Sequence, residues 1–217
     1  MARRFGFGDV LGVDLPGEKP GLMPNRKWKK KALNAPWQQG ETVLVGIGQG
    51  YVLSTPLQLA VMTARLSNGG NMVTPRITRP SPAADLEYFE SAAASDLNQA
   101  PDTNSLGIFP AHLDLIRQAM EGVVNNPIGT AFKARIKKKG RHMAGKSGTV
   151  QVRRITKAER EEGVVKNKDL PWRERDHAMF VAYAPIDKPR YAVSVVIEHG
   201  GGGSSVAAPI ARDILIE

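Results

Sequence analysis

The sequence predicts an α+β protein in which helices accompany an antiparallel sheet. Two short runs rich in β-branched and aromatic residues, 178–184 and 191–197, are separated by a stretch bounded by prolines, the pattern of two antiparallel strands with a tight connection. A further strand is predicted from Ala144, where a Lys-Ser-Gly-Thr tetrad leads into alternating β-branched residues. Amphipathic patterns at 56–67 and 110–125 predict the helices.

The helix at 56–67 has clear start and stop signals. Thr55 offers a side-chain acceptor for the first turn, and Pro56 suits the first helical position because its missing N–H is not needed there. Apolar residues keep one face of the segment through Ser67. The following residues, Asn68-Gly69-Gly70, can take positive φ and end the helix.

The second helix is predicted to begin at Pro110 and to end near Asn125-Asn126-Pro127, and its apolar residues lie three or four apart. We expect this face to pack in the core. Near the end of the chain, the glycines at 200–203 break the backbone, and a terminal helix is predicted at 206–216.

The remaining segments are predicted to be irregular. Glycine and proline are spaced too closely in the first forty residues for a long regular element, so these residues are interpreted as a surface segment. Residues 80–108 have few large apolar side chains and are interpreted as an exposed excursion. Residues 153–175 are highly charged and are expected to form a mobile surface loop with Trp172 as its one large apolar anchor.

Composition excludes several classes of protein. The 217 residues are 41% hydrophobic and 24% charged, which is ordinary for a globular protein. The sequence contains no apolar run of 18 residues that could span a bilayer and no cysteine for a disulfide or a thiolate site. The histidines show no close metal-ligand spacing, so neither a metal nor another cofactor is expected; they are His112, His142, His177 and His199.

The net charge of +9 favours a polyanionic partner in principle, because nucleic acids, anionic lipids and acidic wall polymers attract basic proteins. The positive residues gather at 26–31, at 133–141 and at Arg153-Arg154. Runs of like charge most often lie on exposed surfaces, and no zinc-finger, RNP-type or GXXG motif accompanies these. They are therefore interpreted as solvated loop and helix-end charges.

The tetrad is the segment with the most chemistry. Lys146 supplies a cation, Ser147 and Thr149 supply hydroxyls, and Gly148 lets a substrate backbone lie close against a strand. The backbone N–H of Thr149 could stabilise a developing oxyanion. This combination suits a site that receives a carboxylate and an acyl group.

By itself the tetrad is also compatible with an exposed edge strand that carries a solvated lysine. A phosphate-binding loop is the less fitting alternative. Its first glycine would have to precede a Gly-Lys-Ser run by four residues, and the loop would lead into a helix. Here Gly145-Lys146-Ser147 leads into a segment with the pattern of a strand.

Blocks of residues along the whole chain make it resemble class B penicillin-binding proteins, and especially the elongation-type penicillin-binding protein 2. The blocks occur in the order of that family. They are 5–8 (FGFG), 12–18 (GVDLPGE), 40–42 (GET), 47–50 (IGQG), 55–60 (TPLQLA), 146–149 (KSGT), 176–178 (DHA), 180–185 (FVAYAP) and 192–201 (AVSVVIEHGG).

The resemblance implies an antiparallel sheet covered by helices, the penicillin-binding and serine β-lactamase-like transpeptidase fold. It implies a peptidoglycan D,D-transpeptidase in which Lys146 and Ser147 are catalytic, Gly148 and Thr149 bind substrate, and the Thr149 N–H completes the oxyanion hole. The expected partners are the peptidoglycan stem peptide, β-lactam antibiotics and membrane proteins of the elongation machinery. The expected location of the parent protein is the periplasmic face of the bacterial inner membrane.

Enzymes of this kind carry three motifs, Ser-x-x-Lys with the nucleophile, Ser-x-Asn, and Lys-Thr-Gly or a relative of it. Only the third is present, because no serine of this chain is followed by lysine three positions later or by asparagine two positions later. In the family both missing motifs precede the block at 5–8. We therefore expect residues 1–217 to be the C-terminal portion of a transpeptidase domain without its nucleophile, with Met1 in the interior of a natural protein and Glu217 within the last helix.

Two other readings stay open at this point. A non-catalytic scaffold or regulatory module could keep the same fold without the chemistry, and a parent sequence without Ser-x-x-Lys would favour it. A basic nucleic-acid-binding module would instead show a steep salt dependence and a defined site size. We do not expect nucleic acid as a partner.

Overall fold

The computed structural model describes residues 1–78, 105–153 and 155–216. The α-helices are α1 (Arg26–Leu33), α2 (Gln39–Gly46), α3 (Pro56–Ser67), α5 (Pro110–Asn125), α6 (Lys157–Glu162) and α7 (Ala208–Ile216). The strands are β1 (Ala144–Val150), β2 (His177–Ala184) and β3 (Tyr191–Ile197). A π-helical turn, Gly203–Ala207, leads directly into α7, and short 3-10 helices lie at Ala2–Phe5, Phe132–Ala134, Asn167–Asp169 and Trp172–Glu174.

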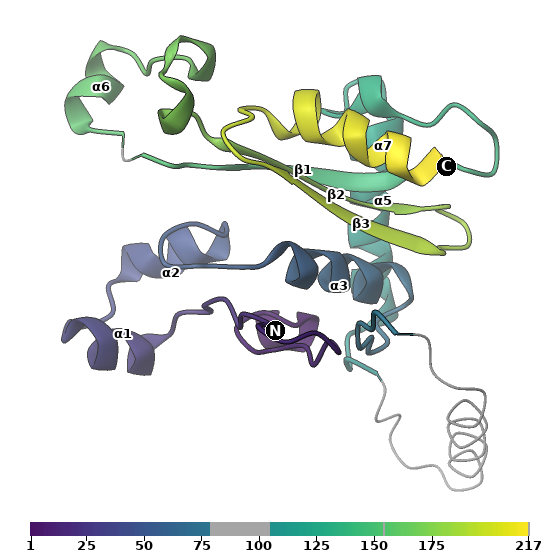
Figure 1. The fold of residues 1–217 in the computed structure, drawn as a ribbon, viewed down its shortest axis with the longest axis horizontal. Coiled ribbons are helices and arrows are strands. Elements are labelled where there is room, and N and C mark those ends of the chain that lie inside the picture. The colour runs from purple at the N-terminus through teal and green to yellow at the C-terminus, as the bar shows by residue number, and fades with distance from the viewer. Residues whose placement is uncertain (79–104, 154, 217) are drawn as a thin grey trace, which may run out of the picture.

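The three strands form one antiparallel sheet in the order β1-β2-β3 (Figure 1). β1 pairs with β2 so that Lys146 lies opposite Val181 and Thr149 lies opposite Ala178. β3 pairs with the other edge of β2. The predicted strands and their antiparallel pairing are confirmed, and β2 begins one residue earlier than expected, at His177.

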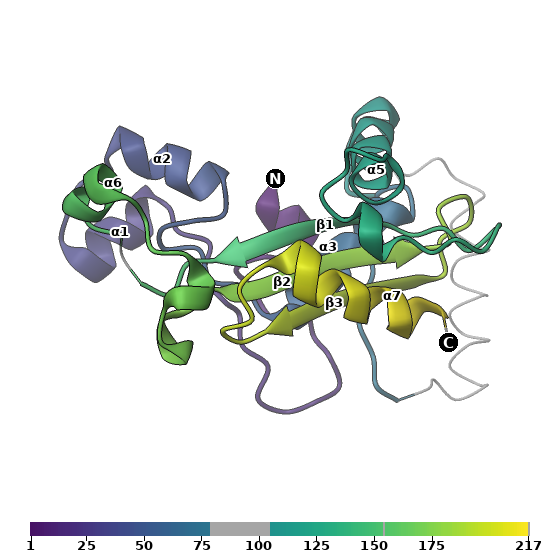
Figure 2. The same ribbon diagram turned by 90° about the horizontal axis from the view of Figure 1, so that it is seen from above.

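Helices cover both faces of this sheet, as Figures 1 and 2 show. Because side chains alternate along a strand, successive residues of β2 enter different clusters. Phe180 and Ala182 pack in a core that includes alanines of α7, whereas Val181 and Tyr183 pack with Leu66 of α3 and with α5. The predicted α+β fold, an antiparallel sheet covered by helices, is confirmed.

Helix α3 begins where the sequence predicts and ties the N-terminal segment to the sheet. The Thr55 hydroxyl accepts from the Gln58 N–H, and the Gln58 side chain accepts in return from the Thr55 N–H, so both ends of a capping box are present. Gln58 is fully buried, and its side-chain amide donates to the carbonyls of Asp9 and Pro20. These bonds hold two irregular stretches of the chain against the start of the helix.

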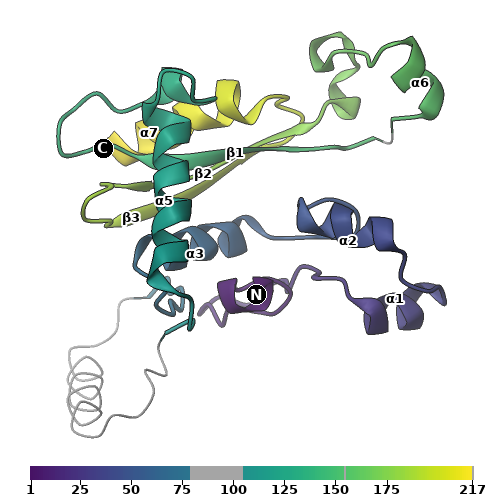
Figure 3. The ribbon, with the colours of Figure 1, turned by 180° about the vertical axis from the view of Figure 1, so that it is seen from behind.

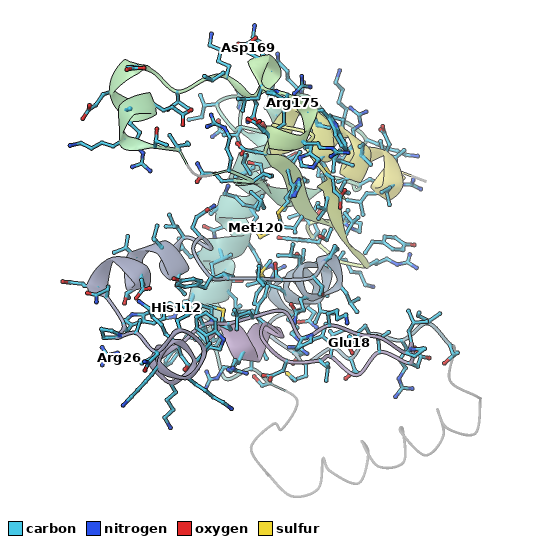
Figure 4. The ribbon with its side chains drawn as sticks, turned by 60° about the vertical axis from the view of Figure 1, so that its left-hand side comes forward. Glu18, Arg26, His112, Met120, Asp169 and Arg175 are labelled. Carbon is cyan, nitrogen blue, oxygen red and sulfur yellow. The ribbon has the colours of Figure 1, made fainter. Side chains whose placement is uncertain are left out.

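Helix α5 also has its predicted bounds, and it links the layers of the molecule. Figure 3 shows it rising from the level of α3 to the level of the sheet, and Figure 4 places Met120 between these two levels. Leu113, Met120 and Val124 are buried on its inner face, and the Asn125 side-chain amide donates to the Met143 carbonyl just before β1. None of the helices in the described residues, α5 included, is long and apolar enough to cross a membrane.

The first forty residues are less irregular than expected, because they contain a 3-10 helix at Ala2–Phe5, helix α1 and the start of α2. Asn25 caps helix α1 by accepting from the Trp28 N–H, which allows a helix to form within the basic run. Lys29 faces inward, is 5% exposed and forms an ion pair with Glu41 of α2 at 2.5 Å. One charge of the basic run is therefore structural, while its neighbours in α1 face solvent.

Two other irregular segments have more structure than expected. Most of the predicted excursion, residues 79–104, lies outside the described residues, but at its end Leu106 is buried, and its N–H donates to the Gly70 carbonyl. The segment predicted as a loop at 153–175 contains α6 and two 3-10 helices, with Arg154 outside the described residues. Its predicted anchor, Trp172, packs edge-on against the His199 ring at a centroid distance of 4.5 Å, although it remains 58% exposed.

Candidate active site

The whole tetrad lies on β1, which in the described sheet is an edge strand. Gly145 allows this placement, because a Cβ there would come within 2.7 Å of the Phe180 ring on β2. The predicted strand is confirmed, because Gly145 and the residues after it lie in β1, whereas a phosphate-binding loop would lead into a helix. Alternation along the strand directs Lys146 and Gly148 to the α3 side of the sheet, and Ser147 and Thr149 to the α7 side.

The polar groups of the tetrad are available to a ligand. Lys146 is exposed, and among the described residues its ammonium donates only to the neighbouring Ser147 carbonyl, at 2.8 Å. Within the part of the chain that the structure describes, no carboxylate forms an ion pair with it. The hydroxyls of Ser147 and Thr149 have no hydrogen bond to another described residue. Among the described residues, one positive charge and two hydroxyls therefore lie uncompensated on the same strand, the charge on the α3 side of the sheet and the hydroxyls on the α7 side.

A groove of about 510 Å³ runs beside the second half of the tetrad. Gly148, Thr149 and Val150 border it, whereas Lys146 and Ser147 are not among its lining residues. Its wall is mostly apolar and comes from the sheet, from the stretch between α2 and α3, and from the N-terminal segment. The other lining residues are Ala2, Phe7, Met23, Val45, Ile47, Gly48, Gln49, Val52, Leu53, Ser54, Pro56, Leu59, His177, Met179 and Val196.

Sequence reasoning did not identify the residues that support this end of β1. Met179 and His177 lie on β2 beside the groove, and Gly203 of the π-helical turn lies directly against the Gly148 peptide. A Cβ at Gly203 would overlap the carbonyl oxygens of Met179 and Gly148 and lie 3.1 Å from the Gly148 nitrogen. The glycine run indicated only a chain break, because a sequence does not show which backbone a glycine will touch.

The groups with displaced pKa values lie away from the tetrad. Hydrogen bonds from the Thr78 side chain and from the backbone N–H groups of Ile77 and Thr78 lower the pKa of Asp14 to about 2. A hydrogen bond from Arg153, at 2.7 Å, and a second one from the backbone N–H of Thr156 lower the pKa of Glu159, and burial raises that of Tyr183. They lie in a loop, in α6 and in the core, respectively.

Among the described residues, neither a metal-binding cluster nor either of two further cavities involves the tetrad. Among residues 1–78, 105–153 and 155–216, no three His, Cys, Asp or Glu side chains gather in a way that could hold a metal ion. Two further cavities, of about 470 Å³ beside α6 and about 530 Å³ between the β2–β3 connection and the end of α7, contain no residue of the tetrad.

The family model and the similar curated proteins point to the same family. Residues 1–216 match the penicillin-binding protein transpeptidase domain family. The chain is 41% identical over 211 residues to the peptidoglycan D,D-transpeptidase MrdA of Haemophilus influenzae, and 35% identical over 212 residues to MrdA of Escherichia coli K12. The alignments cover 97% and 98% of this chain but 31% of each relative, so the chain spans less than half the length of these relatives.

Solved structures of similar fold lead to the same group. The structure of Pseudomonas aeruginosa PBP2 in complex with WCK 5153 is 36% identical, with a TM-score of 0.74 over 99% of this chain and 41% of that one. The complex of PBP2 and MreC from Helicobacter pylori gives 31% identity and a TM-score of 0.73, covering 97% of this chain and 33% of that one.

Proposed function

Because this chain belongs to the penicillin-binding protein transpeptidase domain family, we propose that it is the C-terminal portion of that domain in a peptidoglycan D,D-transpeptidase, with the nucleophile-bearing part outside it. The observation that supports this most directly is the Lys-Ser-Gly-Thr tetrad on an edge strand, with its second half bordering an apolar groove. An edge strand can accept an extended peptide alongside it, since one row of its backbone groups is unpaired.

The reaction of the parent enzyme has two displacement steps. A serine hydroxyl attacks the penultimate D-Ala carbonyl of a stem peptide, and the terminal D-Ala leaves with a proton on its amine. An amine of a neighbouring stem peptide then attacks the acyl-serine ester and frees the serine, so that one peptide bond is exchanged for another. A β-lactam carbonyl would acylate the same serine and stop the cycle after the first step.

Within that reaction each tetrad residue has a role, and Ser147 and Thr149 share one. The Lys146 ammonium supplies positive potential and a shared proton beside the nucleophile, and its lack of a carboxylate partner in the described residues suits that role. The hydroxyls of Ser147 and Thr149 bind the carboxylate of substrate or β-lactam. The Thr149 N–H stabilises the oxyanion, and Gly148 keeps the strand accessible.

The same proposal accounts for the groove. Its walls are mostly apolar and include the exposed side chains of Ile47 and Leu53, which are 68% and 62% exposed. An apolar surface of this kind is usually covered by another part of a protein. The nucleophile-bearing part of the domain is the occupant that the family membership favours, and it would bring the serine to the tetrad.

Partners and location follow from the same family. One relative, PBP2 of Helicobacter pylori, has been solved in complex with MreC, and another, from Pseudomonas aeruginosa, in complex with WCK 5153. For the protein that contains this chain we propose stem peptides as substrate, β-lactams as inhibitors and membrane proteins of the elongation machinery as partners. Its proposed location is the periplasmic face of the inner membrane.

The absence of a nucleophile from this chain leads to a simple test. Incubation with a labelled penicillin should leave the intact mass of the chain unchanged, because Lys146 does not replace the serine as a nucleophile. The parent protein, treated in parallel, should gain the mass of one penicillin. A stable adduct on the chain alone, or none on the parent, would contradict the proposal.

A further inference from the structure

Two histidines meet at the end of the sheet that carries the tetrad. His177 is the first residue of β2 and lies opposite Val150 of β1, and His199 follows the end of β3. The backbone N–H of His199 donates to Nδ1 of His177 at 2.9 Å, and the two rings lie edge to face at 4.7 Å. Nδ1 of His199 lies 2.9 Å from the Arg175 carbonyl.

These contacts determine which ring nitrogens carry protons. Nδ1 of His177 accepts a hydrogen bond, so a neutral His177 carries its proton on Nε2. Nδ1 of His199 faces a carbonyl, which only accepts, so this nitrogen carries the proton of the His199 ring. The nearest charged groups along the chain are Arg175 and Asp176, just before β2, and Glu198, just before His199.

His199 adopts a left-handed backbone conformation, which is uncommon for residues other than glycine. Its φ is +56°, where the Cβ crowds the following carbonyl oxygen. Such a conformation persists only where surrounding contacts hold it. Here the His199 N–H donates to Nδ1 of His177, and Nδ1 of the His199 ring lies at hydrogen-bond distance from the Arg175 carbonyl. The Trp172 ring packs against the His199 ring.

The turn that contains His199 also touches the tetrad strand. Two residues further on, the Gly201 N–H donates to the Asp176 carbonyl at 2.8 Å. Gly203 then packs against the Gly148 peptide without room for a Cβ. The chain from His199 to Gly203 therefore connects the histidine pair to the half of the tetrad that borders the groove.

We propose that His177 and His199 are positioning residues for the transpeptidase site. Their hydrogen bond holds the turn between β3 and α7 in the arrangement that seats Gly203 against Gly148, and this contact fixes the Gly148 and Thr149 peptides at the edge of the groove. The role rests on the proposed function of the tetrad. Neither histidine needs to touch the reacting atoms.

The test uses substitutions at His177 in the full-length parent protein. His177→Leu and His177→Gln leave the His199 N–H without a well-placed acceptor, whereas the Oδ1 of His177→Asn can occupy nearly the same place as Nδ1. The measurement is acylation by a fluorescent penicillin, separated into the affinity of the non-covalent complex and the first-order acylation step. Leu and Gln should slow the acylation step roughly tenfold, and Asn should recover most of the rate.

Two comparisons separate positioning from a general loss of folding. His142→Leu alters an exposed histidine and should leave the rate within about twofold of wild type. A variant that only unfolds more of the protein would lower the amount of penicillin bound at saturation and leave the rate of the folded fraction unchanged. If the Leu variant does not fold, the comparison of the acylation rates of the Asn and Gln variants still tests the proposal. Equal rates for Asn and Gln, or a Gln variant at the wild-type rate, would overturn the proposal.

The same assay distinguishes this proposal from the one on which it rests. If Lys146→Ala is acylated at the wild-type rate, the proposed function of the tetrad fails. If Lys146→Ala is slow while all His177 variants match wild type, the tetrad keeps its function and only the positioning role of the histidines fails.

Discussion

At the level of single residues, Lys29 shows how folding changes the role of a charge. It belongs to a run of basic residues, yet it is almost fully buried because Glu41 of α2 lies 2.5 Å away. Glu41 also accepts from the Gln38 N–H at the start of α2. This hydrogen bond and the one from Lys29 lower the pKa of the Glu41 carboxyl. The pair therefore fastens α1 to α2.

Replacing Lys29 by methionine should destabilise the chain, because Glu41 would keep its negative charge without a partner. Because the ammonium that neutralises Glu41 is lost, we expect the melting temperature to fall by roughly 3–8 °C. The matched control is Lys27→Met on the exposed side of α1, which should change it by less than about 2 °C. If calorimetry gave the same change in melting temperature for both substitutions, the Lys29–Glu41 ion pair would make no specific contribution to stability.

The lowered pKa of Glu41 gives this contribution a pH dependence of known sign. A carboxyl whose pKa is lower in the folded state favours folding at every pH above its unfolded value, about 4.5. The contribution is lost as the pH falls through the lowered value. The difference in melting temperature between wild type and Lys29→Met should therefore shrink below about pH 4.

The same residue shows where sequence reasoning stops. A run of six residues with five positive charges reads as solvated surface, because nothing local indicates that Glu41, twelve positions after Lys29, will meet one of them. Asn25 caps α1 through its side chain, and the interpretation of the glycine- and proline-rich segment as irregular did not take this residue into account. The tetrad could be singled out because its residues are contiguous and because the other family-like blocks accompany it in order.

At the level of elements, the structure agrees with the sequence for α3, α5, β2 and β3, whose signals are local. The bounds of α3 and α5 follow from a proline at the first position and from residues that end the helix, and β2 and β3 follow from runs of β-branched residues. The groove could not be predicted, because its walls come from residues as distant in sequence as Ala2 and Val196. Its shape depends on how the layers pack.

The close contact between the π-helical turn and β1 predicts that a larger side chain at Gly203 will destabilise the protein. Gly203→Ala adds a methyl group where the Met179 and Gly148 carbonyls leave no space, so the turn or the strand must shift. We expect a loss of stability of roughly 2–4 kcal/mol, measured by denaturant unfolding.

Gly122→Ala is the matched control for this substitution. Gly122 lies in α5 with no atom within 4 Å of an added Cβ, and alanine should stabilise a helix there by about 0.5–1 kcal/mol. A Gly203→Ala variant as stable as the Gly122→Ala control would show that the turn and the tetrad strand are not in tight steric contact at Gly203.

At the level of the whole molecule, the described layers leave apolar surface uncovered. Ile47 and Leu53 line the groove and remain largely exposed, and Val43 on α2 is exposed as well. The sheet and the α2–α3 layer lie on opposite sides of this groove. Such an arrangement is consistent with a chain that is normally covered by another part of its domain.

We predict that the isolated chain associates with itself through this surface. Light scattering should show species larger than a monomer at micromolar concentration, and a hydrophobic dye should bind. Ile47→Glu should reduce both signals, whereas Ile128→Glu, at another exposed isoleucine outside the groove, should reduce them much less. A strict monomer without dye binding would contradict this expectation.

The central claim is that the tetrad belongs to a transpeptidase active site, and Lys146 tests it most directly. The measurement is the second-order rate constant of acylation by a labelled penicillin in the full-length parent protein. Lys146→Ala removes a cation and a donor from the place where negative charge develops, so the rate should fall by roughly a hundredfold to a thousandfold. Lys138→Ala, in the nearby exposed basic run, should stay within a few-fold of wild type, because its charge acts only through screened attraction. Equal rates for the two variants, or a Lys146→Ala rate close to wild type, would contradict the account.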